Sequence, residues 1–477
     1  MLQTCIPLLA DTLDRLPPHR GNIRGRLKND LAALRRKVVV LDDDPTGVQT
    51  VNGVYVYTRW DAGTLTEAFL APEQMFFVLT NSRGLTSVES REQHRQIAEA
   101  VAEAAERTGQ DFLLLSRGDS TLRGHWPMET ETLRGVLENR TGKHYDGEVL
   151  CPFFPEGGRY TLNDIHYVLQ GGMLVPAGET EFARDRSFGY VSSNLSDWVE
   201  EKSAGRFPAA GCCSIGLDEL RRGDVDGIAE KLKAVTEFGK IIVNAADYGD
   251  LEVFTAALCE AVSAGKEFLF RCAAALPKVL GGVPDRPLLE RGELIDPDSR
   301  SGGIILIGSH VRKTTRQLEV LQCSALPLEY ICFDQHRVLE PGGLEDEVRR
   351  VLSLLEQLLP AGNSAVVHTR RDRLDLDTDN PDLQLRISVQ ISDALTSVIG
   401  RLPVRPSFIV AKGGITSSDV GTKALRVRRA LVMGQIRPGI PVWQTGSESR
   451  FPGLPYVIFP GNVGSEDDLL RIAKILL

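Results

Sequence analysis

Several well-known functional motifs are missing from this chain of 477 residues. No Gly-x-Gly triplet occurs, which excludes the glycine fingerprints of dinucleotide-binding folds and protein kinases. The Walker motif GxxxxGK[ST] is also missing, so a bound nucleoside triphosphate would need another kind of phosphate loop. GxSxG and HExxH do not occur either, which disfavours the common serine hydrolases and zinc proteases.

Cysteines and long apolar runs are scarce as well. The eight cysteines are scattered without a Cys-x-x-Cys pair, so we expect reduced thiols in a cytoplasmic protein. No stretch supplies about 18 consecutive apolar residues, so no membrane span is expected, and the charged N-terminus does not fit a signal peptide. The formal net charge is -9 and no block of Lys and Arg occurs, so nucleic acid is not an expected partner.

What the sequence does contain is an alternation of short apolar runs with longer amphipathic stretches, which predicts two α/β domains, each with a largely parallel sheet flanked by helices. We expect a helical arm at residues 1–36, a first domain at 37–285, a linker at 286–302 and a second domain at 303–477. The strands expected in the first domain are 37–42, 54–60, 75–82, 112–117 and 148–154. Those expected in the second are 303–310, 328–334, 364–372, 407–419 and 455–464.

Polar side chains collect after the strands of the first domain, where the loops of an open α/β sheet bind ligands. They are Asp42, Asp43, Asp44, Thr46 and Gly47 after the first strand, then Arg83, then Asp119, Ser120, Thr121 and Arg123, then Arg159 and His166. Three adjacent carboxylates cannot all be ionised at a dry strand end without cost, so a partner, a metal or a substrate hydroxyl should accompany them. The alternative is that Asp44 caps a helix and Asp42 is simply exposed. Arginines at such a site suit a carboxylate or phosphate ligand.

Glycine-rich turns follow the strands of the second domain. Gly308 and Ser309 follow one strand, Gly413, Gly414 and Thr416 follow another, and Gly461 and Gly464 precede the last helix. Glycines allow backbone amides to approach phosphate closely, and a hydroxyl nearby can bind an oxygen or a metal. Three such turns in one domain favour a nucleotide or phosphate site.

The chain resembles the four-carbon acid sugar kinase family. The motifs that carry the resemblance are "DDPTG" (43–47), "DSTLRG" (119–124), "GGRYTLNDIHYV" (157–168), "GSH" (308–310), "KGGITSSD" (412–419) and "GQIRPGIPVW" (434–443). They occur in the family order and span nearly the whole chain. The resemblance implies a kinase that uses ATP and Mg²⁺ to phosphorylate the terminal hydroxyl of threonate, erythronate or 3-oxo-tetronate. It also implies a sugar-acid domain, an ATP domain and an active site in the cleft between them.

The resemblance also assigns residues. The catalytic carboxylates would be Asp43, Asp44 and Asp119, one of which would accept the hydroxyl proton. Arg123 and Arg83 would bind the substrate carboxylate. The remaining substrate-binding positions from the resemblance are Thr46, Gly47, Ser120 and Thr121, to which the loops after the strands add Arg159 and His166. The ATP-binding positions are Ser309, Gly413, Gly414, Ile415, Thr416 and Gly464.

Some features depart from the family pattern. Ile415 stands where many members carry Asp, with Asp419 as the substitute, and the last loop reads "FPGNVG" in place of a Lys/Ser/Gly-rich turn. The N-terminal arm is additional and compatible with a homodimer. Two alternatives stay open: a nucleotide-using dehydrogenase of a hydroxy acid, which the missing Gly-x-Gly disfavours, and a non-catalytic sugar-acid sensor, which Ile415 motivates.

Overall fold

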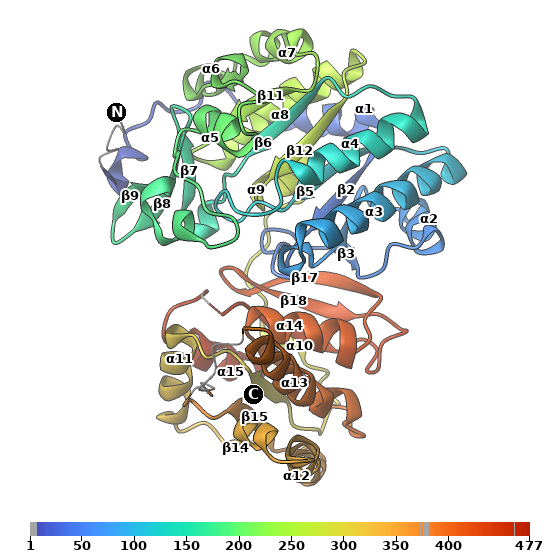
Figure 1. The fold of residues 1–477 in the computed structure, drawn as a ribbon, viewed down its shortest axis with the longest axis vertical. Helices are drawn as coiled ribbons and strands as arrows, with labels where there is room; N and C mark the ends of the chain where they lie inside the picture. The colour runs from blue at the N-terminus through green and yellow to red at the C-terminus, as the bar shows by residue number, and fades with distance from the viewer. Residues whose placement is uncertain (1–6, 373, 375–380, 462) are drawn as a thin grey trace. The chain divides into compact units, whose positions relative to one another are not determined.

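The chain forms two compact units, shown by a computed structural model that describes residues 7–372, 374, 381–461 and 463–477 (Figure 1). The first unit contains Met1–Thr50 and Arg59–Pro284, and the second contains Val51–Thr58 and Asp285–Leu477. Each unit has a sheet flanked by helices, so the predicted α/β fold class is confirmed. Among the described residues, no helix combines the length and apolar character needed to cross a membrane.

The main sheet of the first unit is parallel throughout. Its strands, in spatial order, are β10 (Cys213–Ile215), β11 (Gly239–Val243), β6 (Gly147–Cys151), β12 (Phe268–Cys272), β5 (Asp111–Arg117), β2 (Arg36–Asp42) and β4 (Met75–Leu79). They are almost entirely buried because helices cover both faces, which explains their continuous apolar runs. Parallel strands also bring all their carboxyl ends to one edge, where the loops meet.

The helices of the first unit form two layers (Figure 1). One layer contains α2 (Ala62–Leu70), α3 (Ser87–Thr108) and α4 (Met128–Thr141), and the other contains α1 (Arg24–Leu34), α7 (Val225–Ala234), α8 (Tyr248–Ser263) and α9 (Ala275–Leu280). Helix α3 begins with a complete capping box between Thr86 and Glu89 and ends at Gly109 in a left-handed conformation. The shorter α5 (Leu195–Lys202) and α6 (Leu217–Arg222) complete the unit.

A small antiparallel sheet, which the sequence did not predict, carries two of the predicted site residues. It consists of β1 (Leu8–Leu9), β9 (Met173–Pro176), β8 (Ile165–Gln170) and β7 (Arg159–Leu162). The backbone N–H groups of Thr161 and Ala245 each donate to the other's carbonyl at 3.0 Å. Because Ala245 follows β11, this pair fixes the small sheet, and with it Arg159 and His166, at the carboxyl edge of the main sheet.

The N-terminal arm differs from the prediction. The apolar spacing of residues 6–16 predicts a helix, but the described part of that segment forms β1 and the short 3-10 helix η1 (Ala10–Thr12), and the helix is α1 instead. The helical pattern is too short to be stable alone, whereas the strand gains hydrogen bonds with β9 and the Ala10 N–H donates to the Gly172 carbonyl at 3.0 Å. Residues 1–6 lie outside the described part.

The second unit has a mixed sheet. In spatial order its strands are β3 (Val54–Tyr57), β17 (Arg429–Arg437), β18 (Ile440–Thr445), β19 (Pro455–Phe459), β16 (Ile409–Lys412), β13 (Ile304–Ile307), β15 (Ser364–Thr369) and β14 (Leu328–Phe333). The pairs from β3 to β19 are antiparallel and those from β19 to β14 are parallel. The predicted strand at 54–60 therefore exists, but it pairs with β17 of the second unit.

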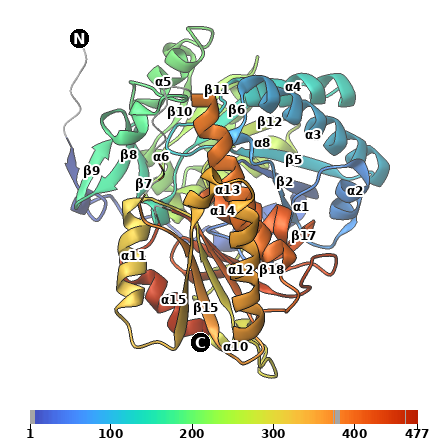
Figure 2. The same ribbon diagram turned by 60° about the horizontal axis from the view of Figure 1, so that its bottom comes forward.

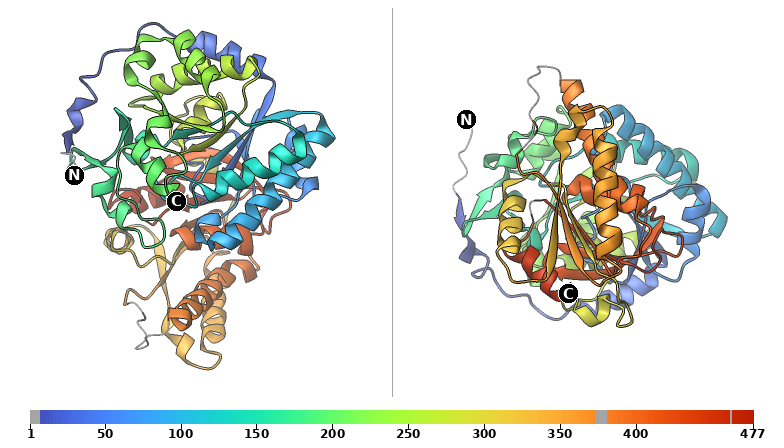
Figure 3. Two further views of the ribbon diagram at one scale, coloured as in Figure 1. Left: turned by 45° about the horizontal axis from the view of Figure 1, so that its top comes forward. Right: turned by 90° about the horizontal axis from the view of Figure 1, so that it is seen from below.

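Helices cover the second sheet on both faces (Figures 2 and 3). α12 (Gly343–Leu358) packs beside α13 (Pro381–Arg401), and α11 (Arg312–Gln322) packs beside α15 (Asp468–Leu476) on the other face. α14 (Gly414–Asp419) follows β16 directly. The segment 286–302, predicted as a linker, contains α10 (Arg291–Leu294) and packs in this unit, since Leu289 is 1% exposed within the hydrophobic core.

The placement of β3 can be tested by truncating one buried valine in each unit. Val56 in β3 and Val40 in β2 are 1% and 0% exposed, and each change to Ala should cost about 2 kcal/mol through the cavity that it leaves. We expect Val56→Ala to lower hydrogen-exchange protection about thirtyfold in β17 and β18, and Val40→Ala to do so in β4 and β5. Loss of protection in β4 and β5 for Val56→Ala, with β17 unchanged, would contradict the assignment.

Candidate functional site

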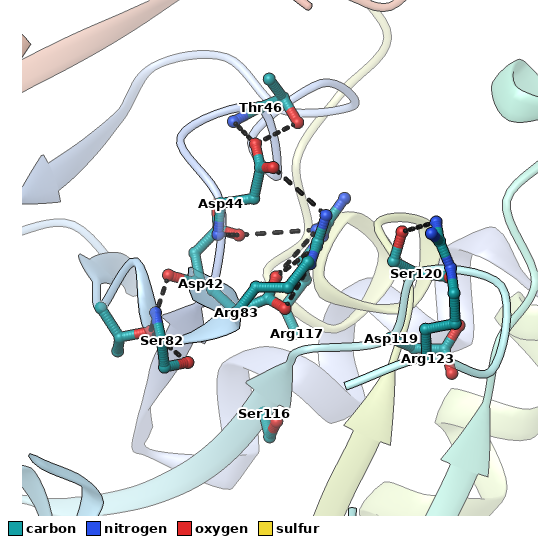
Figure 4. A network of polar contacts seen from close by, with 12 residues as sticks. Asp42, Asp44, Thr46, Ser82, Arg83, Ser116, Arg117, Asp119, Ser120 and Arg123 are labelled. Atoms are coloured by element: carbon teal, nitrogen blue, oxygen red, sulfur yellow. Dashed lines mark hydrogen bonds and ion pairs between the residues drawn. The ribbon is translucent and has the colours of Figure 1, made fainter. Parts of the chain in front are cut away.

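Charged side chains from several strand ends meet at the carboxyl edge of the first unit's sheet (Figure 4). β2 ends at Asp42 and β5 ends at Arg117, and these strands are neighbours. Arg117 Nη1 lies 3.5 Å from Asp42 Oδ1 and 3.7 Å from Asp43 Oδ1. Asp119 and Arg271, from the next loop and from β12, are also buried. Buried charges of both signs thus share one edge of the sheet.

Arg83 joins two of the three adjacent carboxylates. Its Nε and Nη2 donate to the two oxygens of Asp43 at 2.8 and 2.6 Å, and its Nη1 donates to Asp44 Oδ2 at 3.2 Å. Burial opposes ionisation of Asp43, but the adjacent Arg83 outweighs it and holds the pKa of this carboxyl below its ordinary value. Asp43 is therefore ionised and hydrogen-bonded at neutral pH, and the Arg83 fork is occupied by protein carboxylates.

Asp42 behaves differently from its neighbour. Its side chain is buried, and burial, together with the charges of Asp43 and Asp44, raises its pKa to about 8 despite Arg117. The carboxyl is consequently protonated at neutral pH, so the three carboxylates are not all ionised. A Cβ at Gly47 would lie 2.0 to 2.3 Å from the Asp42 carboxyl atoms, which explains why glycine follows this turn.

The simpler interpretation of the acidic cluster, in which Asp44 caps a helix and Asp42 is exposed, is wrong on both counts. Asp42 is 1% exposed, and Asp44 does not cap a helix. Instead Asp44 Oδ1 accepts from the Thr46 N–H at 2.9 Å and from the Thr46 hydroxyl at 2.6 Å within a turn. The predicted grouping of Asp43, Asp44, Thr46 and Arg83 is thus present as one hydrogen-bonded set, of which Figure 4 shows Asp44, Thr46 and Arg83.

A second loop, residues 118–124, wraps around the buried Arg271. The Arg271 Nη2 donates to the Arg123 carbonyl at 2.8 Å, and a Cβ at Gly118 or Gly124 would lie 2.9 or 2.7 Å from its guanidinium. Asp119 Oδ1 accepts from the Leu122 N–H at 3.1 Å and Oδ2 lies 3.8 Å from Arg271 Nε. Burial raises the pKa of Asp119 above its ordinary value although Arg271 opposes this.

The backbone of the same loop is strained. Thr121 and Leu122 both have left-handed conformations, with φ of 57° and 64°, which is uncommon for a threonine and for a leucine. Hydrogen bonds compensate for this strain: Arg159 Nε donates to Thr121 Oγ1 and the Tyr190 hydroxyl donates to the Thr121 carbonyl, both at 2.8 Å. Strain of this kind concentrates at functional sites.

Two further guanidinium groups lie beside this loop. Arg123 donates to the Ser120 carbonyl at 2.9 Å, to Ser120 Oγ at 3.1 Å and to Asp185 at 3.2 Å. Arg123 and Arg159 lie 4.9 and 5.5 Å from the Phe182 ring centre. Burial lowers the pKa of Arg159 to about 10, although Asp119 opposes this. Neighbouring like charges of this kind are suited to an anionic ligand.

His166 lies beneath these groups and is uncharged. Its Nδ1 is 3.1 Å from Thr161 Oγ1, and its buried Nε2 has no hydrogen-bond partner within the described residues. Burial and the nearby Arg159 lower its pKa to about 3. The free nitrogen of a neutral imidazole can form one further hydrogen bond.

Three buried charged residues at this edge are not among the predicted site residues: Arg117, Arg271 and Glu129. Glu129 accepts a short hydrogen bond from Ser116 and lies 3.5 Å from Arg271 Nη1. The sequence contains a signal for two of them, because Arg117 and Arg271 are cations at the ends of otherwise apolar strands. Glu129 looks like an ordinary first-turn helix residue, and only the fold reveals its burial.

The glycine-rich turns of the second unit meet at the carboxyl edge of its parallel strands. A Cβ at Gly308 would lie 2.3 Å from Thr416 Oγ1, and a Cβ at Gly413, whose φ is 127°, would lie 3.1 Å from Ser309 Cβ. Thr314 Oγ1 donates to Ser309 Oγ at 3.3 Å and to the Gly461 carbonyl at 3.2 Å. The predicted grouping of Ser309 with Gly413 and Thr416 is therefore present.

Lys412 connects two of these turns. Its buried amino group donates to the carbonyls of Pro460 and Gly461 at 2.5 and 3.2 Å and lies 3.6 Å from the Phe459 ring centre. Burial, with a smaller effect of Lys313, lowers the pKa of Lys412 to about 6. The residue before the paired glycines thus fixes the loop that follows β19.

The positions that depart from the family pattern have separate surroundings. Ile415, in the first turn of α14, is 73% exposed. Asp419 accepts from Ser392 at 3.1 Å and pairs with Lys423 at 3.2 Å, so its carboxylate is occupied. A Cβ at Gly464 would lie 3.0 Å from Asp468 Oδ2. Asn462 of the last loop lies outside the described residues.

Comparison with known proteins gives the same division into two parts. A family model described as a sugar-binding N-terminal domain matches residues 38–280, and one described as a nucleotide-binding C-terminal domain matches residues 304–469. No curated protein matches the chain.

Two solved structures share the fold, with TM-scores above 0.5. A Haemophilus influenzae protein of the family DUF1537 is 19% identical over 92% of this chain and 100% of its own, with a TM-score of 0.59. A Salmonella typhimurium protein described as a putative tRNA synthase is 17% identical over 91% of this chain and 98% of its own, with a TM-score of 0.63. A Bordetella bronchiseptica DUF1537 protein, a domain-swapped dimer with bound citrate, is 19% identical over 92% and 98%, with a TM-score of 0.38.

We predict that Asp42→Asn, which removes the ionisable carboxyl, gains stability relative to wild type as pH rises. In the unfolded chain this carboxyl ionises near about pH 4, whereas in the fold its pKa is about 8. Between these values the unfolded state releases a proton that the folded state retains, so stability is lost with rising pH. The melting temperature of Asp42→Asn relative to wild type should therefore increase from about pH 5 to about pH 8.

The matched control is Asp226→Asn, because the Asp226 side chain is 85% exposed. Its melting temperature relative to wild type should stay constant over the same range. A constant or falling difference for Asp42→Asn would show that Asp42 is ionised in the fold.

Proposed function

This chain belongs to the four-carbon acid sugar kinase family, and from that premise we propose that it is an ATP-dependent kinase of a small sugar acid. The acceptor would be the terminal hydroxyl of an acid of about four carbons, such as threonate, erythronate or 3-oxo-tetronate. The observation that carries the proposal is the loop 118–124, where the buried Asp119 lies beside the guanidinium groups of Arg271 and Arg159. Such a site provides both a base for the hydroxyl proton and cations for the carboxylate of an acidic substrate.

In this proposal Asp119 is the general base. Its raised pKa supports that role, because a base works best when its pKa lies near the operating pH. Asp43 is a weaker candidate, since Arg83 lowers its pKa and occupies both of its oxygens. Asp43 and Asp44 would then orient the substrate hydroxyls, with Arg83 keeping them in place.

The substrate carboxylate would bind the guanidinium groups of Arg123 and Arg159. Both lie at the 118–124 loop, and guanidinium groups bind carboxylates in two-point geometry. The remaining substrate-binding positions would be Thr46, Gly47, Ser120, Thr121 and His166. His166 is the strongest of these, because its unpartnered Nε2 can bond a substrate hydroxyl.

The nucleotide would bind the glycine-rich turns of the second unit, at Ser309, Gly413, Gly414, Ile415, Thr416 and Gly464. The close approach of Gly308 to Thr416, and of Gly413 to Ser309, brings these turns together, and the exposed Gly414 and Ile415 at the start of α14 would face the phosphates. The Ser309 and Thr416 hydroxyls would be the protein ligands of Mg²⁺, which otherwise binds phosphate oxygens and water. Bound Mg²⁺ would neutralise charge on the transferred phosphoryl group.

The proposal is tested by measuring ADP release from MgATP with a panel of three- to six-carbon sugar acids. We expect ADP release that depends on one acid or a closely related group. ADP release with none of them, combined with binding of both ATP and an acid, would favour the sensor alternative. Stabilisation by a nicotinamide cofactor but not by ATP would favour a dehydrogenase.

We also predict that Asp119→Asn lowers kcat by more than about 100-fold while KM for the acid changes little, because loss of a general base slows proton transfer. Asp226→Asn, at an exposed position of the same unit, should leave both constants unchanged. Steady-state kinetics with the acid that the panel identifies provide the measurement. A loss confined to KM would exclude Asp119 as the base.

A further inference from the structure

Arg371 connects two strand ends of the second unit. It follows β15, and β15 is the parallel neighbour of β13, so the loops after both strands lie at the same edge. Arg371 Nη2 donates to the Ser309 carbonyl at 2.7 Å and to Thr315 Oγ1 at 2.8 Å. The guanidinium thus lies against the Ser309 turn and against the first turn of α11. Neither the motifs nor the family resemblance selected it.

The charge of Arg371 is not neutralised by the described residues. No carboxylate among them lies within ion-pair distance of it, and its Nε and Nη1 are buried without a hydrogen-bond partner. The adjacent Arg370, by contrast, pairs with Asp372 at 2.8 Å and with Asp334 at 3.5 Å. Burial lowers the pKa of Arg371, with only Glu319 opposing this. Arg371 is half-buried, and buried N–H groups of a guanidinium without a partner are costly unless an anion binds them.

The surroundings of Arg371 indicate a phosphate as that anion. The Ser309 turn leads into α11, an eleven-residue helix whose first amide groups favour negative charge. The Val311 N–H donates to Ser309 Oγ at 3.3 Å, so the turn is closed by its own side chain. Arginine binds phosphate through several N–H groups in a fixed plane. The start of α11, the Ser309 turn and the Arg371 guanidinium are therefore adjacent.

We infer that Arg371 binds a phosphate group of the nucleotide and, through Nη2, fixes the Ser309 turn. This inference rests on the proposed kinase function, because it names a residue of the same nucleotide site. Binding would supply the missing partner for the Arg371 guanidinium, and it would make Arg371 a determinant of affinity for phosphorylated nucleotides specifically.

The test compares Arg371→Gln and Arg371→Lys with the matched control Arg370→Gln. Titration calorimetry gives Kd for MgATP, and competition gives Kd for adenosine, which has no phosphate. We expect Arg371→Gln to weaken MgATP binding by at least about tenfold, the effect of one hydrogen bond to a charged group. Adenosine affinity should stay within about twofold, Arg371→Lys should lie between, and Arg370→Gln should match wild type.

Three other outcomes would overturn the inference. MgATP affinity of Arg371→Gln within about twofold of wild type would show that Arg371 does not bind the nucleotide. An equal loss of adenosine and MgATP binding would show a purely structural role. Arg371→Gln could fail to fold, and the folded Arg371→Lys then replaces it. A Kd for MgATP equal to that of wild type in both Arg371→Lys and Arg370→Gln would also reject the inference. Wild-type protein that binds no MgATP would instead refute the proposed function itself.

Discussion

The acidic edge of the first unit depends on the pairing of the Arg83 guanidinium with the carboxyl groups of Asp43 and Asp44. The Arg83 fork neutralises Asp43 and reaches Asp44, while Asp42 remains protonated, so three consecutive carboxyl groups can follow one buried strand. Without that compensation, like charges at a desolvated strand end would repel one another. The arrangement has a chemical consequence as well: Asp42 is neutral, Arg83 binds both oxygens of the Asp43 carboxylate, and Asp44 bonds both Arg83 and the Thr46 turn. In the proposed function Asp119, which Arg83 does not bond and whose pKa burial raises, is the general base.

The candidate sites of the two units consist of different kinds of chemical group. At the carboxyl edge of the first sheet, side chains of both signs are buried together, with loop 118–124 strained around Arg271. At the carboxyl edge of the second sheet, backbone and hydroxyl groups dominate, and the turns approach so closely that only glycine fits at Gly308. The first arrangement suits a small acid whose hydroxyls must be distinguished, since buried polar groups reject a ligand that leaves them unpaired. The second suits phosphate, which backbone amides bind irrespective of what is attached to it.

Much of this arrangement is predictable because it depends on local sequence. Buried parallel strands are continuous apolar runs, and their last residues lie at one edge, so the order of residues along the chain is enough to group Asp43, Arg83 and Asp119.

The features that the sequence does not predict depend on tertiary contacts. Val54–Tyr57 is an apolar run that fits either sheet, and only its pairing with β17 decides between them. The apolar residues at 8–13 fit a helix or an edge strand equally well, and hydrogen bonds to β9 select the strand. Leu289 and Leu294 are separated by charged residues, so their segment resembles a linker until their burial is seen.

In the proposed function the first unit binds the acid and the second binds the nucleotide. Amide hydrogen exchange distinguishes the two sites, with MgATP alone and with the acid alone added to the wild-type protein. MgATP should protect residues 308–311 and 413–416 of the second unit, and the acid should protect residues 42–47 and 118–124 of the first. Protection of residues 42–47 by MgATP, with no change at residues 413–416, would contradict this assignment.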